Sequence, residues 1–379
     1  MDSIEPLDRA REAAVQFTCL GDLVRVEAFG TGHINRTFVV SMDQGGTRLR
    51  YLLQLVNTFV FKNPYGLMDN VVRVTSHLRQ RLAGEGVSDL SRRCLTVVPS
   101  LDGKPYHVDA EGGFWRCYIF IEGAVASELM DSEAKARSLG HAAGRFQYLL
   151  ADLPGPRLVE TIPSFHDARS RFEALERAAA GDAAGRLARA APELDFWRAR
   201  REGFDRIVVA LERGLVPERI THNDTKIDNL LVDIRSGEGI CVIDLDTVMP
   251  GSSAYDFGDL ARTVSASTGE DDRQSERMEL AMPMYQALVQ GFASGTHASG
   301  EGRGGSFLTA GERELLPWGA RILTMLMGVR FLTDFLEGDV YYRVAREGHN
   351  LDRTRTQMAL IASMEGHWDG MRRAIDECF

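Results

Sequence analysis

The sequence has few of the residues and patterns that mark several common classes of protein. Five of its 379 residues are cysteine, and no two of them form a C-x-x-C pair. This excludes a cysteine zinc site and argues against a disulfide framework. No run of about 18 uncharged apolar residues occurs, so no membrane span is expected. The first residues carry acids early and lack the apolar segment of a secretory signal, which predicts a cytoplasmic protein.

Positive charge is also scarce. The chain has 44 Lys and Arg residues against 54 Asp and Glu residues, a formal net charge of -10 and a pI of about 5.5. A chain this acidic is a poor general ligand for nucleic acid, because phosphate backbones require concentrated Lys and Arg. No nucleic-acid partner is therefore expected, although a local cationic pocket for nucleotide phosphates is compatible with this charge.

The order of apolar residues along the chain predicts two lobes. Short strand-like segments fill the first third, around one helical segment at residues 66–84. After Gly123 helical periodicity dominates, with helices expected at residues 192–214, 274–292 and 352–375. We predict an α+β fold with a sheet-rich N-lobe, residues 1–122, and a mainly helical C-lobe, residues 123–379.

One segment carries residues suited to phosphoryl transfer. T-H-N-D-T-K-I-D-N, residues 221–229, precedes V-I-D-L-D, residues 242–246. This reaction requires a carboxylate that orients the attacking hydroxyl and accepts its proton, and hard oxygen ligands for Mg²⁺. The spacing from Asp224 to Asn229 matches the catalytic loop of protein kinases, and Asp244 follows at the end of the next strand. We predict Asp224 as the base and Asn229 and Asp244 as magnesium ligands.

The alternative is that these residues merely form turns, because Asn and Asp favour turns. The combination of loop, hairpin and trailing D-L-D favours the catalytic interpretation. The sequence G-x-x-x-x-G-K-[ST] is absent, which excludes a P-loop kinase.

These motifs identify a resemblance. The chain resembles the aminoglycoside phosphotransferase and choline kinase family, and within it the bacterial N-acetylhexosamine 1-kinases. The segments that carry the resemblance are GTGHIN (30–35), YLLQLVN with FKNP and LM (51–68), THNDTKIDNLL (221–231), CVIDLDTVMPGS with YDFGD (241–259) and MGVRFLTDFLEGDVYY (327–342). They are spread over both lobes. The resemblance implies a bilobal protein-kinase-like fold, ATP as phosphoryl donor and Mg²⁺ as cofactor.

The resemblance also implies a nucleotide site in the N-lobe. Gly30, Thr31 and Gly32 lie between two predicted strands, where a Gly-rich hairpin covers the nucleotide phosphates; an ordinary hairpin turn is the alternative. Kinase-like N-lobes usually carry a Lys on the third strand for the α- and β-phosphates, but this sequence has Gln54 there. We expect Lys226, two residues after the predicted base, to supply the missing charge; a solvated loop Lys is the alternative.

Further acidic residues accompany the predicted metal site. Asp246 is expected on the same strand face as Asp244, because side chains of a strand repeat every two residues, and it is a further candidate metal ligand. Asp228 is expected to face solvent. Asp259 resembles the family Asp that binds the backbone of the catalytic loop, or it caps a helix. His222 is expected to hold this loop rather than to act in catalysis.

For the acceptor, the resemblance points to a small sugar. Arg330, Tyr341 and His33 are the implied sugar contacts, with Phe257 adding packing. Arg330 interrupts an apolar helical run and needs a partner there; an internal salt bridge with Asp334 is the alternative. The implied reaction phosphorylates the anomeric hydroxyl of an N-acetylhexosamine and gives an α-sugar 1-phosphate.

Two other functions stay open. The chain is alternatively a kinase of another hydroxylated metabolite, such as choline, ethanolamine, homoserine, methylthioribose or an aminoglycoside. Cationic acceptors require an acidic or aromatic pocket, which an Arg at position 330 disfavours. The second alternative is a kinase-like binding module without activity, against which the intact Asp224, Asn229 and Asp244 argue. The sequence leaves the oligomeric state open.

Overall fold

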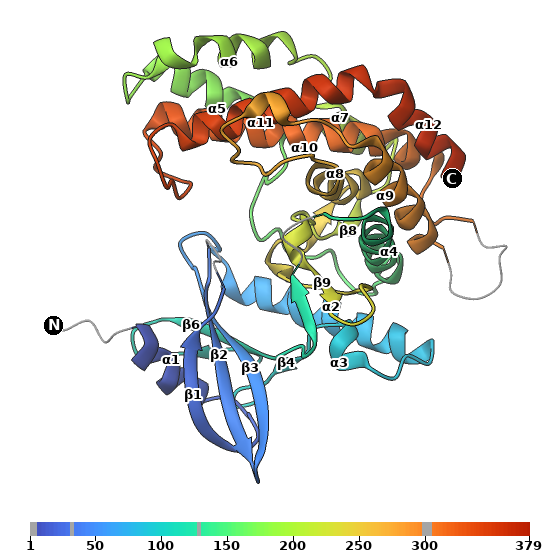
Figure 1. The fold of residues 1–379 in the computed structure, drawn as a ribbon. Coiled ribbons are helices and arrows are strands. Elements are labelled where there is room, and N and C mark those ends of the chain that lie inside the picture. The colour runs from blue at the N-terminus through green and yellow to red at the C-terminus, as the bar shows by residue number, and fades with distance from the viewer. Residues whose placement is uncertain (1–5, 31–33, 127–129, 298–304) are drawn as a thin grey trace. The chain divides into compact units, whose positions relative to one another are not determined.

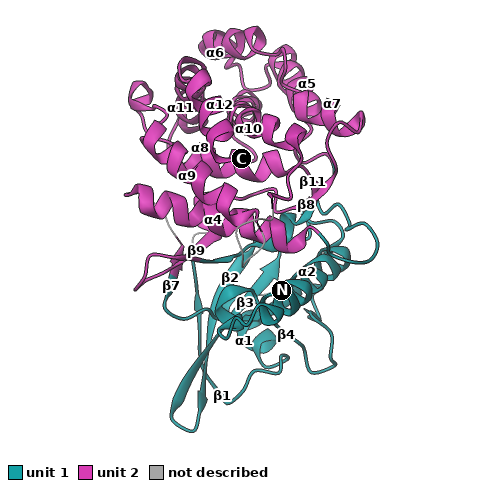
Figure 2. Ribbon diagram, turned by 90° about the vertical axis from the view of Figure 1, so that its right-hand side faces the viewer, with its two compact units in different colours: residues 1–124, 152–163, 240–249 teal, residues 125–151, 164–239, 250–379 magenta. Residues whose placement is uncertain are grey.

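The computed structural model describes residues 6–30, 34–126, 130–297 and 305–379 (Figure 1). The chain forms two compact units, which Figure 2 shows in different colours. The first unit comprises residues 1–124, 152–163 and 240–249, and the second comprises residues 125–151, 164–239 and 250–379. The predicted boundary after residue 122 therefore falls close to the first change of unit, but the chain returns to the first unit twice.

The first unit is built on an antiparallel sheet of six strands in the order β1-β2-β3-β6-β4, with β5 paired to β6. Glycines close its central hairpin, because Gly45 and Gly46 adopt φ of 60° and 89° between β2 and β3. The elements are α1 (Pro6–Ala14), β1 (Asp22–Ala28), β2 (Arg36–Gln44), β3 (Thr47–Val56), α2 (Pro64–Gly84), α3 (Leu90–Arg93), β4 (Val97–Val98), β5 (His107–Val108) and β6 (Phe114–Ile119).

Alternation along these strands gives the sheet one apolar face. Val40, Leu53 and Trp115 are fully buried there, and α1 covers them with its small residues Ala10 and Ala13. Small side chains on α1 let the helix approach the sheet closely, so this face forms the core of the first unit.

Helix α2 binds the two segments that return to the first unit. Its N-terminus is set by Asn63, whose side chain accepts from Gly66 N at 3.0 Å, and by Pro64 at the first helical position. The buried Asn70 donates to the carbonyls of Val159 at 2.7 Å and Val248 at 3.0 Å, and accepts from Val159 N at 3.0 Å. One fully paired amide thus joins three separate parts of the chain.

The second unit is mainly helical. Its elements are α4 (Glu133–Leu150), α5 (Ala168–Gly181), α6 (Leu187–Ala199), α7 (Arg206–Glu212), β8 (Arg219–Thr221), the 3₁₀ turn η1 (Ile227–Asn229), β9 (Leu230–Asp233), α8 (Ser253–Val264), η3 (Ser275–Arg277), α9 (Met282–Gly295), α10 (Ala310–Glu337), α11 (His349–Gly366) and α12 (Trp368–Cys378). Four further elements fall at changes of unit or in the returning segments: β7 (Ala124–Ala126), β10 (Gly239–Val242), η2 (Leu245–Thr247) and β11 (Met249–Gly251).

Helix α10 is the central helix of the second unit. It begins with a capping box of Thr309 and Glu312 and ends at Gly338, which adopts φ of 99°. It is long and apolar enough to cross a membrane by length and composition, but 78% of its apolar window is buried inside the structure. This burial is typical of the core helix of a globular protein.

Glycines allow close contacts between helices of the second unit. A Cβ on Gly319 of α10 would lie 1.9 Å from the carbonyl oxygen of Ala254 in α8, and a Cβ on Gly258 would lie 2.3 Å from the carbonyl carbon of Gly319. Helices α8 and α10 therefore cross with their backbones in contact, which fixes the position of α8.

Three predicted helices differ from the structure. The predicted helix 192–214 is two helices, α6 and α7, because Gly203 adopts φ of 76° between them. The helix predicted from residue 274 begins only at Met282, after the 3₁₀ turn η3. The helix predicted over residues 352–375 is interrupted at His367, which separates α11 from α12.

Candidate active site

The loop after β8 is held by a buried carboxylate. Asp256, in the first turn of α8, accepts from the backbone N–H of His222 at 2.9 Å and of Asn223 at 2.7 Å, and from Gln147 Nε2 at 2.8 Å. Asn223 adopts φ of 66°, a left-handed conformation that Asn tolerates better than most residues. The predicted base Asp224 directly follows this strained residue, so its position is set by the backbone and not by a mobile turn.

Two later residues of the same loop contact Asp224. Asn229 Nδ2 donates to the Asp224 carbonyl at 2.7 Å and to its Oδ2 at 2.9 Å, and Lys226 Nζ lies 3.7 Å from Oδ2. Burial by itself would raise the pKa of Asp224, but Lys226, His222 and the Asn229 amide together hold it below its ordinary value. The carboxylate is therefore ionised at neutral pH, as a proton acceptor must be.

An arginine faces this carboxylate from α10. The guanidinium carbon of Arg330 lies 5.5 Å from the ring centre of Tyr342 and 5.8 Å from those of Tyr341 and Phe165. Burial by itself would lower the pKa of Arg330, whereas the two tyrosines and the Asp224 carboxylate outweigh burial and raise it. Arg330 is thus a partly buried cation in an aromatic surrounding, within electrostatic range of the predicted base.

Asp334, the predicted alternative partner of Arg330, accepts hydrogen bonds from other groups. Asp334 accepts from the backbone N–H of Tyr341 at 2.7 Å and of Tyr342 at 3.0 Å, and from Asn350 Nδ2 at 2.8 Å. Over the described ranges of the chain, Arg330 forms no ion pair with a carboxylate. An internal Arg330–Asp334 salt bridge is therefore not the reason for this buried charge.

Two further residues belong to this cluster and were not predicted. Arg171 of α5 donates to the Phe165 carbonyl at 3.2 Å, and its buried Nε has no hydrogen-bond partner among the residues that the structure describes. Burial and the nearby Arg330 lower the pKa of Arg171. His166 Nε2 lies 2.8 Å from the carbonyl oxygen of Asn223, and because a carbonyl only accepts, Nε2 carries the hydrogen.

In the first unit, the D-L-D segment forms a tight turn and not a strand. Strand β10 ends at Val242, Asp244 adopts φ of 60° and ψ of 58°, and residues 245–247 form the 3₁₀ turn η2. The prediction that Asp244 and Asp246 share a strand face is therefore wrong, because the left-handed residue ends the extended chain. Like Asn223, Asp244 is a non-glycine residue held in a strained conformation, which is frequent at functional sites.

Asp246 is buried and has partners at both oxygens. Arg116 of β6 forms an ion pair with Oδ1, and Asn35 Nδ2 donates to Oδ2 at 2.6 Å. Arg116 Nε also donates to Gln54 Oε1 at 2.9 Å. With both oxygens engaged by protein groups, Asp246 supports the turn, and a direct or indirect role at the metal stays a prediction.

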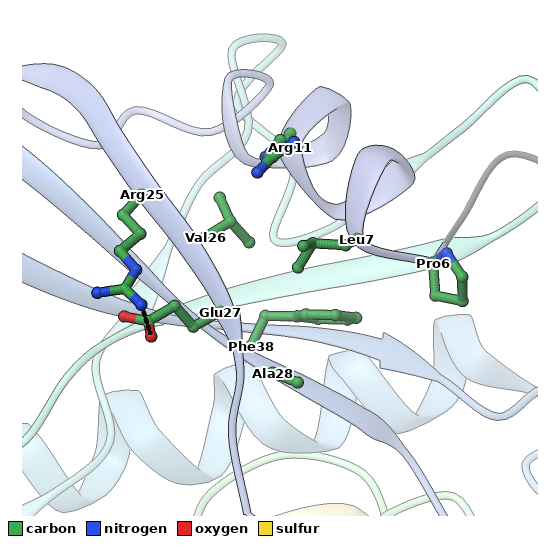
Figure 3. A pocket seen from close by; sticks show the side chains of 8 residues that line it. All are labelled: Pro6, Leu7, Arg11, Arg25, Val26, Glu27, Ala28 and Phe38. Atoms are coloured by element: carbon green, nitrogen blue, oxygen red, sulfur yellow. Dashed lines mark ion pairs between the residues drawn. The ribbon is translucent and has the colours of Figure 1, made fainter.

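A hollow elsewhere in the first unit has a different character. It measures about 480 Å³, and the side chains that line it come from α1, β1 and β2 (Figure 3). Leu7, Val26 and Phe38 give it an apolar wall, and its charged residues include the ion pair between Arg25 and Glu27, whose nitrogen and oxygen lie 2.6 Å apart. None of the residues predicted for catalysis lines it.

Comparison with known proteins identifies the family of the chain. The sequence profile described as APH, Phosphotransferase enzyme family, matches residues 25–288. The match includes both the catalytic loop and the D-L-D turn. The chain belongs to this family. It is a phosphotransferase by family, in agreement with the chemistry predicted for residues 221–246.

Solved structures show the same fold. An aminoglycoside phosphotransferase from Alicyclobacillus acidocaldarius subsp. acidocaldarius DSM 446 is similar with a TM-score of 0.60 at 12% identity, over 100% of this chain and 98% of that chain. Choline kinase from Cryptosporidium parvum Iowa II gives 0.57 at 13% identity, over 93% and 92%. A spectinomycin phosphotransferase in complex with ADP and spectinomycin gives 0.56 at 11% identity, over 99% and 100%. The predicted α+β, protein-kinase-like fold is confirmed.

Magnesium binding stays a prediction, and its two predicted ligands lie in different units. Asn229 offers an amide oxygen and Asp244 a carboxylate, both hard ligands. Within the part of the chain that the structure describes, no group of three or more His, Cys, Asp and Glu gathers as a metal site.

Several predicted residues lie elsewhere than expected. Phe257, predicted to add packing at the sugar site, is fully buried and packs instead against Tyr285 and Phe292 in the core. Asp259 is paired to Arg262 at 2.9 Å; the backbone of the catalytic loop is bound by Asp256, and Ser252 caps α8. The sequence pointed to Asp259, whereas Asp256 binds the loop. The two acids lie three residues apart on α8 and therefore on the same side of the helix.

The structure also shows the surroundings of the remaining predicted residues that it describes. Gly30 adopts φ of 73° with open space where a Cβ would be, whereas Thr31, Gly32 and His33 lie outside the described residues. Asp228 is exposed, and His222 is fully buried with its Nδ1 accepting from Asp224 N at 3.2 Å, as expected of a scaffold residue. Tyr341 is 61% exposed beside Arg330 and stays a predicted sugar contact.

Proposed function

We propose that this phosphotransferase transfers the γ-phosphoryl group of ATP to the anomeric hydroxyl of an N-acetylhexosamine, such as N-acetylglucosamine or N-acetylgalactosamine, and releases the sugar 1-phosphate. The observation that carries the proposal is the presence, within one unit, of the ionised Asp224 near the cations Arg330 and Arg171, which both contact Phe165 beside the His166 side chain that binds the catalytic loop. The first residue supplies a proton acceptor, and the other two determine which acceptors can bind beside it.

The charges around Asp224 disfavour cationic acceptors. Choline, ethanolamine and aminoglycosides carry ammonium groups, which two neighbouring guanidinium groups repel. Uncharged sugars meet no such repulsion, and guanidinium N–H groups donate to hydroxyl and N-acetyl oxygens. The exposed face of Tyr341 suits the apolar side of a pyranose ring.

The chain's own residues account for the proton transfer. The Asp224 carboxylate accepts the proton of the attacking hydroxyl, and the Asn229 amide fixes the direction of its Oδ2. The anomeric hydroxyl is more acidic than an ordinary alcohol because of the ring oxygen, so a carboxylate of lowered pKa suffices. Lys226 lies beside the same oxygen and stays our candidate for a contact with the transferred phosphoryl group. Bound Mg²⁺ supplies neutralisation of the charge on the phosphates.

The test uses purified protein with ATP, magnesium and one sugar at a time. ADP release and loss of reducing ends are followed in parallel, with the 1-O-methyl glycoside of each sugar as the matched control. The proposal predicts equal ADP release and reducing-end loss with the free sugar, neither with the glycoside, and loss of both in Asp224→Asn. ADP release from the glycoside, or faster release with choline or an aminoglycoside than with any sugar, would overturn it.

A further inference from the structure

The first unit contains a buried arginine that the proposed reaction has not yet used. Arg116 lies on β6, directly opposite Gln54 of β3 in the strand register, and is 1% exposed. A fully buried guanidinium in the middle of a sheet requires partners, because removing a charge from water costs several kcal/mol. Its partners here are the oxygen of Gln54 and the carboxylate of Asp246.

These contacts form one continuous network. Gln54 Nε2 donates to Thr37 Oγ1 at 3.1 Å, and Asp246 Oδ2 accepts a hydrogen bond from Asn35 Nδ2. Asn35 Oδ1 in turn accepts from Asn57 N at 2.9 Å. The network therefore runs from the strands of the sheet to the turn η2, through a residue that directly precedes β2.

We infer that Arg116 is a positioning residue: through Asp246 it fixes the turn η2, and so holds the backbone that presents Asp244 to magnesium nucleotide. The inference rests on the proposed phosphoryl transfer. Gln54 occupies the lysine position but carries no charge, and the register places the arginine one strand away from it. Gln54 accepts a hydrogen bond from Arg116 Nε at 2.9 Å.

The geometry of the turn explains why this matters for the metal. Asp244 is the residue before η2 and adopts a left-handed conformation, φ of 60° and ψ of 58°. Asp246 is the middle residue of η2 and is bound by Arg116. The pair therefore holds the turn that follows Asp244, and it neutralises a second carboxylate two residues from the predicted ligand.

Burial by itself would lower the pKa of Arg116, but the Asp246 and Asp244 carboxylates together with Tyr118 outweigh burial and raise it. The arginine thus stays charged in the core. A lysine at this position keeps the charge, but a compact ammonium does not reproduce the fork that contacts Gln54 and Asp246 at once.

The test compares Arg116→Met and Arg116→Lys with the exposed control Arg50→Met, which lies on β3 and pairs with Glu122. Two readouts are used: binding of ADP at increasing magnesium concentration, measured by calorimetry, and the magnesium concentration for half-maximal turnover. We expect Arg116→Met to raise that concentration and the KM for ATP by about tenfold or more, with the KM for the acceptor unchanged. Arg116→Lys should recover part of the loss, and Arg50→Met should match the wild type.

A purely structural role would give a different result. The double variant Arg116→Met with Asp246→Asn removes both charges and so avoids an unpaired buried ion. If it folds, with a wild-type circular dichroism spectrum, and needs no more magnesium than the wild type, the inference is overturned while the kinase proposal stands. If wild-type protein binds no magnesium ADP at all, the proposed function fails, and the inference with it.

Discussion

At the scale of single residues, His166 gives the second unit a pH-dependent stability. Burial, Arg330 and Arg171 lower its pKa to about 4, although the Asn223 carbonyl and Asp224 act in the opposite direction. In the unfolded chain an imidazole titrates near about 6.5. Between these two values the unfolded state binds a proton that the folded state does not, so stability falls as the pH decreases through this window.

This leads to a prediction for His166→Gln, which keeps a side-chain N–H but does not titrate. Its free energy of unfolding should depend less steeply on pH between about 4 and 6.5 than that of the wild type, and the two should run parallel above this window. Urea denaturation at a series of pH values measures the difference. Identical slopes in both proteins would show that His166 is not buried as a neutral group.

Asp256 carries a second prediction at this scale. Its carboxylate satisfies two backbone N–H groups of the catalytic loop and one side-chain amide, and all three would be left unpaired in Asp256→Ala. We expect a loss of about 2–5 kcal/mol of stability together with most of the activity. Asp228→Ala, an exposed residue of the same loop, should change stability by less than about 0.5 kcal/mol. Chemical denaturation distinguishes them; equal effects would contradict the assignment of Asp256 as the loop support.

Some residues of the candidate site can be recognised from the sequence alone, and others cannot. Asp224, Asn229 and Asp244 could be proposed from the sequence because their spacing is local, within one loop and the next turn, and their roles stay predictions. Arg116, Asp256 and Arg171 act on residues far away in the sequence, and nothing in the spacing shows such partners. A signal existed for Arg116, since a lone charge within the apolar strand F-W-R-C-Y-I requires a buried partner.

At the scale of elements, the crossing of α8 and α10 positions the residue that supports the catalytic loop. Gly319→Ala places a methyl group 1.9 Å from a backbone oxygen of α8, and backbone cannot move aside as a flexible side chain can. We expect a loss of about 1–3 kcal/mol and a lower rate, because α8 carries Asp256. Thermal unfolding and turnover measure both.

The matched control is Gly366→Ala at the end of α11, where a Cβ meets nothing within 4 Å. This variant should be as stable as the wild type or slightly more stable, by up to about 1 kcal/mol. A similar loss in both variants would mean that helix propensity, and not the close contact, decides the effect.

The elements themselves were largely predictable from periodicity and turns. The strands of the first unit and α2 follow from alternation, from Gly45 and Gly46, and from the Asn63-Pro64 start. The breaks at Gly203 and His367 were missed, because helical periodicity continues through them and only the packing of the flanking helices shows the change of direction. The left-handed Asp244 was missed for a similar reason, since D-L-D reads equally well as the end of a strand.

At the scale of the whole molecule, the first unit is not continuous in sequence. Asn70 binds residues 159 and 248, Arg73 donates to the Pro156 carbonyl at 2.8 Å, and Arg81 pairs with Asp152. A fragment of residues 1–124 lacks all of these partners. We expect this fragment to show no cooperative unfolding transition, whereas the full chain does; urea titration followed by circular dichroism tests this. A cooperative transition in the fragment would show that the returning segments are dispensable.

The side-chain amide of Asn70, which binds the carbonyl of Val248, has a consequence for synthesis on the ribosome. Val248 follows Asn70 by 178 residues, which at about 5–20 residues per second takes roughly 10 to 35 s to translate. During that interval α2 has been made, but its buried amide lacks one of the carbonyls that it binds in the finished protein. The nascent first unit therefore stays incomplete while the catalytic loop region is still being added, although all strands of its sheet have been made. We expect folding of the nascent first unit to finish only when the segment around Val248 leaves the exit tunnel, which makes the D-L-D turn the last part of that unit to assemble.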